Sequence, residues 1–117
     1  MAMKLINRSA ITVIPAQPFL DWLHQVDPSS AHLTLADLRR EPAIYLLPEC
    51  ESKDEALEGL RGGGIPKIFE EQLNGWYRLS SAWPKQRDLQ TFCHWFECSF
   101  HSMIFDLGTG RLRHEES

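Results

Sequence analysis

Long apolar runs, paired cysteines and an excess of basic residues are all missing from this sequence of 117 residues. No stretch approaches the ~20 apolar residues needed to span a bilayer, so no contact with a membrane is expected. The start of the sequence, Met1 to Ile6, is followed at once by Asn7 and Arg8, and its apolar part is too short for a secretory signal peptide. The number of cysteines is odd, and none of the three, Cys50, Cys93 and Cys98, belongs to a C-x-x-C pair. This pattern favours a reducing, cytoplasmic location.

The charge balance is acidic, with 12 basic and 16 acidic residues and a net charge of -4. A chain without a positive field is a poor ligand for nucleic acid or for anionic lipid, and neither partner is expected. The composition, 43% apolar and 24% charged, is typical of a globular protein. We therefore predict a single α/β domain over residues 1–117, with flexible ends at 1–7 and 111–117.

The first half of the chain contains two candidate strands separated by helices. Residues 9–14 are rich in β-branched side chains and predict a strand. Apolar residues at helical spacing predict a helix over 19–26, and a shorter helix over 34–38 would begin at a threonine cap. Residues 43–47 have no polar alternation, which predicts the central strand of the sheet, buried on both faces.

The second half is mainly helical. Ser52 and Glu55 have the spacing of a capping box and begin a helix that ends at the glycine triplet 62–64. Helices are expected over 66–76 and 86–97, and a third strand over 99–107. In that strand His101, Met103 and Phe105 should share one face, because successive side chains alternate.

The predicted fold is therefore a small three-stranded sheet covered by helices, in the order β-α-α-β-α-α-α-β. A sheet of three strands leaves two edges to protect, so pairing of edges across a homodimer is one possible assembly. Gln72 falls among the apolar positions of its helix, and its amide therefore needs hydrogen-bond partners.

Aromatic residues suggest an interaction surface. Trp22 is explained by the apolar face of its helix, whereas Tyr77, Trp83 and Trp95 fall on no such face. Unburied aromatic side chains commonly anchor protein interfaces. The first hypothesis is thus a non-enzymatic interaction or regulatory domain that self-associates or binds a protein partner, using these aromatics beside the acidic segment 49–58.

A small enzyme or ligand-binding protein is the alternative. Glu49 follows the predicted central strand, and ligands of parallel α/β sheets bind beyond the carboxyl ends of strands. Asp106 would join Glu49 only if two strands run parallel, and His24 or His101 would support them as acid or base. Cys50 is a poor candidate nucleophile, because flanking carboxylates raise the pKa of a thiol.

Two further patterns point to no site. Cys93, His94, Cys98 and His101 are residue types that bind zinc, but their spacing directs them to different sides of a helix and a strand. The glycine-rich segment 59–67 follows an acidic helix rather than a strand and matches no phosphate-binding motif. No metal and no cofactor are therefore expected.

Five segments spread along the chain carry a resemblance to a known family: N-R-S-A-I-T-V-I-P from Asn7, Q-P-F-L-D-W-L-H from Gln17, Y-L-L-P-E-C from Tyr45, F-E-E-Q-L-N-G-W-Y from Phe69 and F-H-S-M-I-F-D-L from Phe100. With them the chain resembles a family of short bacterial proteins to which no activity is assigned. The resemblance implies a compact bacterial cytoplasmic protein and supplies no catalytic or binding residues. The glycine triplet departs from the continuous acidic helix that the family would have there.

Overall fold

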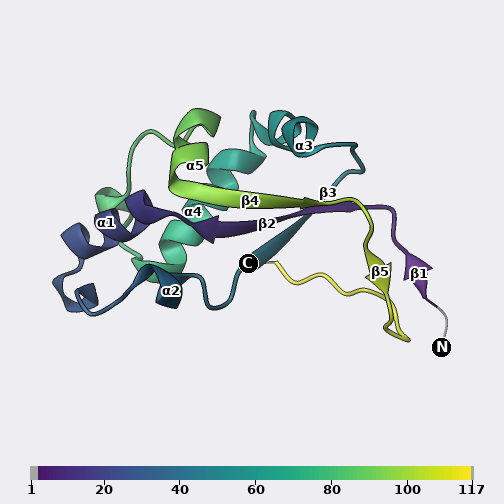
Figure 1. Ribbon diagram of the computed structural model, residues 1–117, viewed down its shortest axis with the longest axis horizontal. Helices are drawn as coiled ribbons and strands as arrows, with labels where there is room; N and C mark the ends of the chain where they lie inside the picture. The colour runs from purple at the N-terminus through teal and green to yellow at the C-terminus, as the bar shows by residue number, and fades with distance from the viewer. Residues whose placement is uncertain (1–2, 117) are drawn as a thin grey trace.

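The computed structural model describes residues 3–116, and it contains a three-stranded sheet, a two-stranded sheet and five α-helices within that range (Figure 1). Residues 1, 2 and 117, which belong to the predicted flexible ends, lie outside the described residues. None of the described helices has the length and apolar character that a bilayer crossing requires. The elements are β1 (Lys4–Leu5), β2 (Ser9–Pro15), α1 (Gln17–Val26), η1 (Pro28–Ser30), α2 (Leu35–Leu38), β3 (Ala43–Leu47), α3 (Lys53–Leu60), α4 (Gly64–Trp76), η2 (Ser80–Ala82), α5 (Leu89–Trp95), β4 (Phe96–His101) and β5 (Phe105–Asp106).

The predicted α/β fold is confirmed, including the order of strands and helices from β2 to β4. The larger sheet has the order β3-β2-β4, and both neighbours pair with β2 in the antiparallel sense. Ile11 of β2 lies opposite Tyr45 on one side and Phe100 on the other. The central strand is thus β2, whose residues are all buried or half-buried.

The prediction that residues 43–47 form the central strand is wrong. β3 lies at the sheet edge and is buried on one face only, with Ile44 66% and Leu46 51% exposed. An uninterrupted apolar run is typical of a strand covered on both sides, but an edge strand with an open apolar face has the same pattern. Sequence pattern alone therefore does not separate these two positions.

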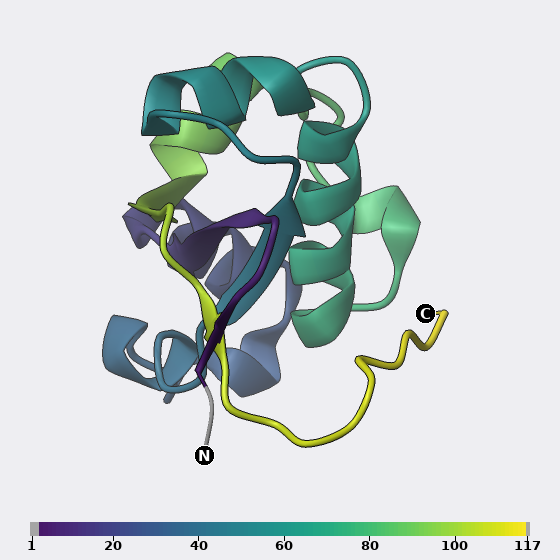
Figure 2. The ribbon, with the colours of Figure 1, turned by 90° about the vertical axis from the view of Figure 1, so that its right-hand side faces the viewer.

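The hydrophobic core lies between one face of the sheet and the helices (Figure 2). α3, α4 and α5 cover this face, and α1 packs against α5 at the end of β2. Phe69 of α4 contacts Phe96 of β4 edge to face, with ring centroids 5.1 Å apart, and Phe92 of α5 lies 6.2 Å from Phe69. Such aromatic pairs favour edge-to-face packing because of the ring quadrupole. The opposite face of the sheet receives none of these helices.

Side-chain caps fix several helix starts. Thr34 and Asp37 form a reciprocal capping box at α2, as the predicted threonine cap requires. Ser52 accepts a hydrogen bond from the Glu55 amide at α3, but the Glu55 carboxylate accepts from the Glu51 amide instead of completing the box. The hydroxyl that caps α3 is therefore where the sequence predicts it.

Two predicted boundaries are wrong. The helix expected over 86–97 is shorter, because Asp88 caps α5 at its start and Phe96 is already extended at its end. The strand expected over 99–107 is divided into β4 and β5, since residues 102–104 leave the strand conformation.

Gln72 finds the partner that it needs, because its Nε2 donates to Tyr45 Oη at 2.9 Å.

Candidate functional site

The face of the sheet opposite the core is open. Strand alternation and register place Thr12 of β2 between Ile44 of β3 and Ser99 of β4 on this face, and Ala10 between Leu46 and His101. Ala10 is covered by its neighbours, whereas Ile44 and Leu46 are largely exposed. We call this surface the open face; it consists of Thr12, Ile44, Leu46, Ser99 and His101.

β1 and β5 form a short antiparallel ribbon that leaves the end of the sheet (Figure 1). Leu5 lies opposite Phe105 and Lys4 opposite Asp106, and the Ile6 amide donates to the Ile104 carbonyl at 2.9 Å. Leu5 is 59% and Phe105 47% exposed, so the ribbon presents a bare apolar pair. A ribbon of this length with no layer packed on it is marginally stable in water.

Exposed apolar side chains gather on and beside the ribbon. Leu5 and Phe105 lie opposite each other and therefore share one of its faces. Met3, Met103 and Leu107, two positions away along the chain, are exposed as well. We call this set of side chains the ribbon face: Met3, Leu5, Met103, Phe105 and Leu107.

The ribbon also bends. Figures 1 and 2 both show that it turns away from the side of the sheet that α3, α4 and α5 cover. The ribbon therefore projects at an angle to the sheet, toward the side of the open face (Figure 2). A partner seated in this angle would lie against both the sheet and the ribbon.

Two polar side chains of the open face are hydrogen-bonded to each other. A hydrogen bond of 2.9 Å joins Thr12 Oγ1 and His101 Nε2. At the end far from the ribbon, Arg39 pairs with Glu97, and Arg39 Nε donates to the Pro15 carbonyl at 2.8 Å. Arg39 and Glu97 therefore bring no isolated charge to the open face, whereas Arg8, between β1 and β2, is exposed and donates to the Asn7 carbonyl at 2.8 Å without an ion pair among the described residues.

The three aromatics predicted as interface residues are half-buried and pack against the core. Trp83 Nε1 donates to the Tyr77 carbonyl at 2.7 Å, and Trp95 contacts Phe69 with ring centroids 5.5 Å apart. Trp83 and Trp95 line an open groove of about 460 Å³ together with Trp22, whose Nε1 donates to the Ala82 carbonyl. The indole donors of Trp22 and Trp83 are thus used within the chain.

The four residues of the alternative acid–base site are not brought together. His24 Nε2 donates to the Leu33 carbonyl at 3.0 Å, and Asp106 accepts from the Gly108 amide at 2.7 Å. Figure 1 shows α1, which carries His24, at the opposite end of the molecule from β5, which carries Asp106. Within residues 3–116 no hydrogen bond joins any two of His24, Glu49, His101 and Asp106.

Glu49 lines a small pocket of about 220 Å³ beside α3. Its neighbour Cys50 is fixed by Ser9, whose Oγ accepts from the Cys50 amide at 3.0 Å and donates to the Cys50 carbonyl at 3.3 Å. The sheet is antiparallel, so the argument from the carboxyl ends of parallel strands does not apply to this turn.

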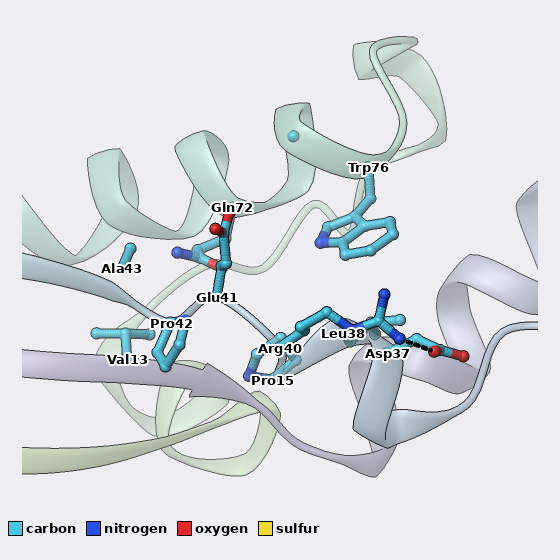
Figure 3. Close-up of a pocket in the computed structure, with 11 residues that line it drawn as sticks. Val13, Pro15, Asp37, Leu38, Arg40, Glu41, Pro42, Ala43, Gln72 and Trp76 are labelled. Atoms are coloured by element: carbon cyan, nitrogen blue, oxygen red, sulfur yellow. Dashed lines mark hydrogen bonds and ion pairs between the residues drawn. The ribbon is translucent and has the colours of Figure 1, made fainter.

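A larger hollow lies between α2, β3 and the end of α4, with a volume of about 570 Å³ (Figure 3). Gln72 and Trp76 project into it from α4, while Arg40 faces them and pairs with Asp37 at 2.9 Å. Behind Gln72, the Tyr45 hydroxyl donates to Glu71, and burial together with this carboxylate raises the pKa of Tyr45. The hollow has no adjacent nucleophile and base of the kind that catalysis requires.

The cysteines and histidines do not converge on a metal. No group of three His, Cys, Asp or Glu side chains in the described part of the chain could hold a metal ion. Cys93 is exposed on α5, while Cys98 is half-buried on the core face of the sheet. Burial raises the pKa of the Cys98 thiol to about 11, which makes this cysteine a weak nucleophile.

The exposed apolar residues of β1, β3 and β5 were not predicted as a site. For Phe105 the predicted last strand is a usable signal, whereas Met103 lies in the break at 102–104, where the predicted alternation does not apply. For Ile44 and Leu46 the apolar run predicted the opposite environment. Comparison with protein-family models, curated proteins and solved structures finds no match for this chain, and its family membership stays a prediction.

Proposed function

We propose that this chain is a non-enzymatic protein-interaction domain that binds its partner through the open face and the ribbon face. One observation carries the proposal. Of nine large apolar side chains that are exposed in the described residues, seven belong to these two surfaces: Met3, Leu5, Ile44, Leu46, Met103, Phe105 and Leu107. Exposed apolar side chains that gather on neighbouring strands mark a binding site more often than side chains that are scattered singly.

The location of the surface differs from the aromatic site that the sequence suggests. Tyr77, Trp83 and Trp95 contribute rings to the core, and two of the indole donors around them are bound to backbone carbonyls. We therefore assign them a supporting role at most. A cytoplasmic location and a regulatory role suit a small binding domain with three free cysteines and remain part of the proposal.

The enzyme alternative has less support. Its acid and base candidates lie at separate places in the fold. His24, His101 and Asp106 are each hydrogen-bonded to a residue outside the candidate set. A catalytic pair needs a base within hydrogen-bond reach of the group that it activates. The described residues supply no such pair among the four candidates.

Site-specific photocrosslinking tests the proposal. A benzophenone side chain is introduced at Phe105 and, as a matched control, at Leu79, which is 58% exposed but lies on neither surface. We expect light-dependent protein adducts from position 105 and far fewer from position 79, in cells that express the full chain. Equal yields from both positions, or none from position 105, would refute the proposed binding surface.

A further inference from the structure

We infer that the partner is a second copy of this chain, and that the ribbon face of each copy packs on the open face of the other. This inference rests on the proposed function and names its partner. The seven side chains are each about half to two-thirds exposed. If a partner covered all of this exposed surface, the area would approach the roughly 800 Å² that one partner contributes to a standard protein interface.

The shape of the surface suits a reciprocal contact. The ribbon bends toward the side of the open face, so the backbone of the sheet and that of the ribbon enclose an angle (Figure 2). A two-fold axis would place the ribbon of each copy in the angle of the other, and Leu5 and Phe105 would then meet Ile44 and Leu46. An interface of this symmetry uses the same surface on both copies and closes as a dimer.

Charge does not oppose this packing, although each chain has a net charge of -4. Lys4 and Asp106 lie opposite each other on the far side of the ribbon, and Glu97 of the sheet is paired with Arg39. None of the side chains that define the two surfaces is acidic, and Arg8, between β1 and β2, is an exposed cation that the dimer must leave in water. Two acidic chains can approach there without placing carboxylates in contact.

Pairing of sheet edges is the less suitable dimer. Pro42 and Pro48 flank β3 and lack the amide hydrogens that a longer added strand needs. On β4, Lys53 Nζ donates to the outward Cys98 carbonyl at 3.5 Å. Prolines beside an edge strand and a lysine at its outer carbonyls are both known to protect a sheet edge. Edge pairing would also leave Ile44 and Leu46 exposed, whereas packing of the two faces covers them.

Sedimentation of the full chain tests the inference. We expect the wild type to sediment at twice the chain mass, and Leu46→Glu and Phe105→Glu each to sediment as monomers with unchanged circular dichroism. Leu79→Glu adds the same charge elsewhere and should remain dimeric. A wild-type monomer up to ~1 mM, the weak end of specific binding, would overturn the inference.

A double variant tests the geometry. If Phe105 of one copy lies on Leu46 of the other, Leu46→Lys with Phe105→Glu places opposite charges together in both halves of the dimer. We expect this double variant to dimerise at least tenfold more tightly than either single variant, and addition of salt should weaken it. A double variant no tighter than the single variants would overturn the proposed arrangement.

The photocrosslinks separate the two proposals. Adducts from position 105 that map to residues 43–47 of another copy support the dimer. Adducts of the same position with other proteins, together with a monomeric wild type, would overturn the dimer and leave the proposed binding function intact. No adduct above the Leu79 control would refute both.

Discussion

At the residue scale, half-buried polar side chains are satisfied by partners that are distant in sequence. Tyr45 Oη donates to Glu71 and accepts from Gln72, and so links the edge strand β3 to α4. The sequence predicts that Gln72 needs partners but not which residue supplies them. That information depends on how α4 crosses the sheet, which is a tertiary property.

Asp88 is a residue whose stabilising role should depend on pH. Its carboxylate accepts from the Thr91 amide at 2.9 Å at the start of α5, and the hydrogen bonds from Thr91 and Gln86 lower the pKa of Asp88 to about 2. The lowered pKa means that the native state favours the charged form. The contribution is complete above the ordinary pKa of 3.8 and is lost as the pH falls toward 2.

We therefore expect Asp88→Ala to lower the melting temperature at pH 7, and the difference from wild type to shrink between pH 4 and pH 2. Asp88→Asn is the matched control, since it keeps an acceptor oxygen that does not titrate. Its stability should fall less steeply than that of wild type over the same range. Thermal unfolding followed by circular dichroism measures all three proteins, and a constant wild-type-to-alanine difference would contradict the expectation.

At the element scale, helices and their caps follow from the sequence better than strand environments do. Thr34 and Ser52 cap α2 and α3, and the caps depend on residues three positions away. The position of β3 depends instead on which strand pairs with which, and on the absence of α3, α4 and α5 from one face. The break at residues 102–104 has no local sequence signal, yet it separates β5 from β4 and allows the ribbon to bend away from the sheet (Figure 1).

The glycine triplet between α3 and α4 contains positions with different constraints. A Cβ at Gly62 would meet nothing within 4 Å, whereas a Cβ at Gly64 would lie 2.5 Å from Leu60 Cδ2 and 3.2 Å from Leu60 Cβ. Neither glycine has a positive φ, so backbone strain does not separate them. The difference is a matter of packing alone.

Gly62→Ala should therefore stabilise the chain by about 0.4–1 kcal/mol, because it restricts the unfolded state at no steric cost. Gly64→Ala should be less stable than Gly62→Ala by about 1–3 kcal/mol, the usual cost of overpacking. Urea unfolding measures both differences. Equal stabilities would show that Leu60 moves aside freely.

At the scale of the whole molecule, the folded structure is more elongated than a compact domain of the same number of residues. The radius of gyration is 15.8 Å and the extents are 49 × 28 × 25 Å. A compact chain of this length would have a radius of roughly 13 Å. The ribbon projects beyond the sheet in Figure 1 and contributes to this extension while it exposes apolar side chains. Packing against a second copy would cover both the projecting ribbon and its apolar side chains.

A dimer that holds part of the fold together should make thermal stability depend on protein concentration. Above the dissociation constant, each tenfold rise in concentration adds about 1.4 kcal/mol per dimer. For a chain of this size we expect the melting temperature to rise by about 2–5 °C per tenfold change. Leu46→Glu should melt at one temperature at all concentrations, and Leu79→Glu should follow wild type. A wild-type melting temperature that is independent of concentration would mean that the ribbon and the open face are stable without a partner copy.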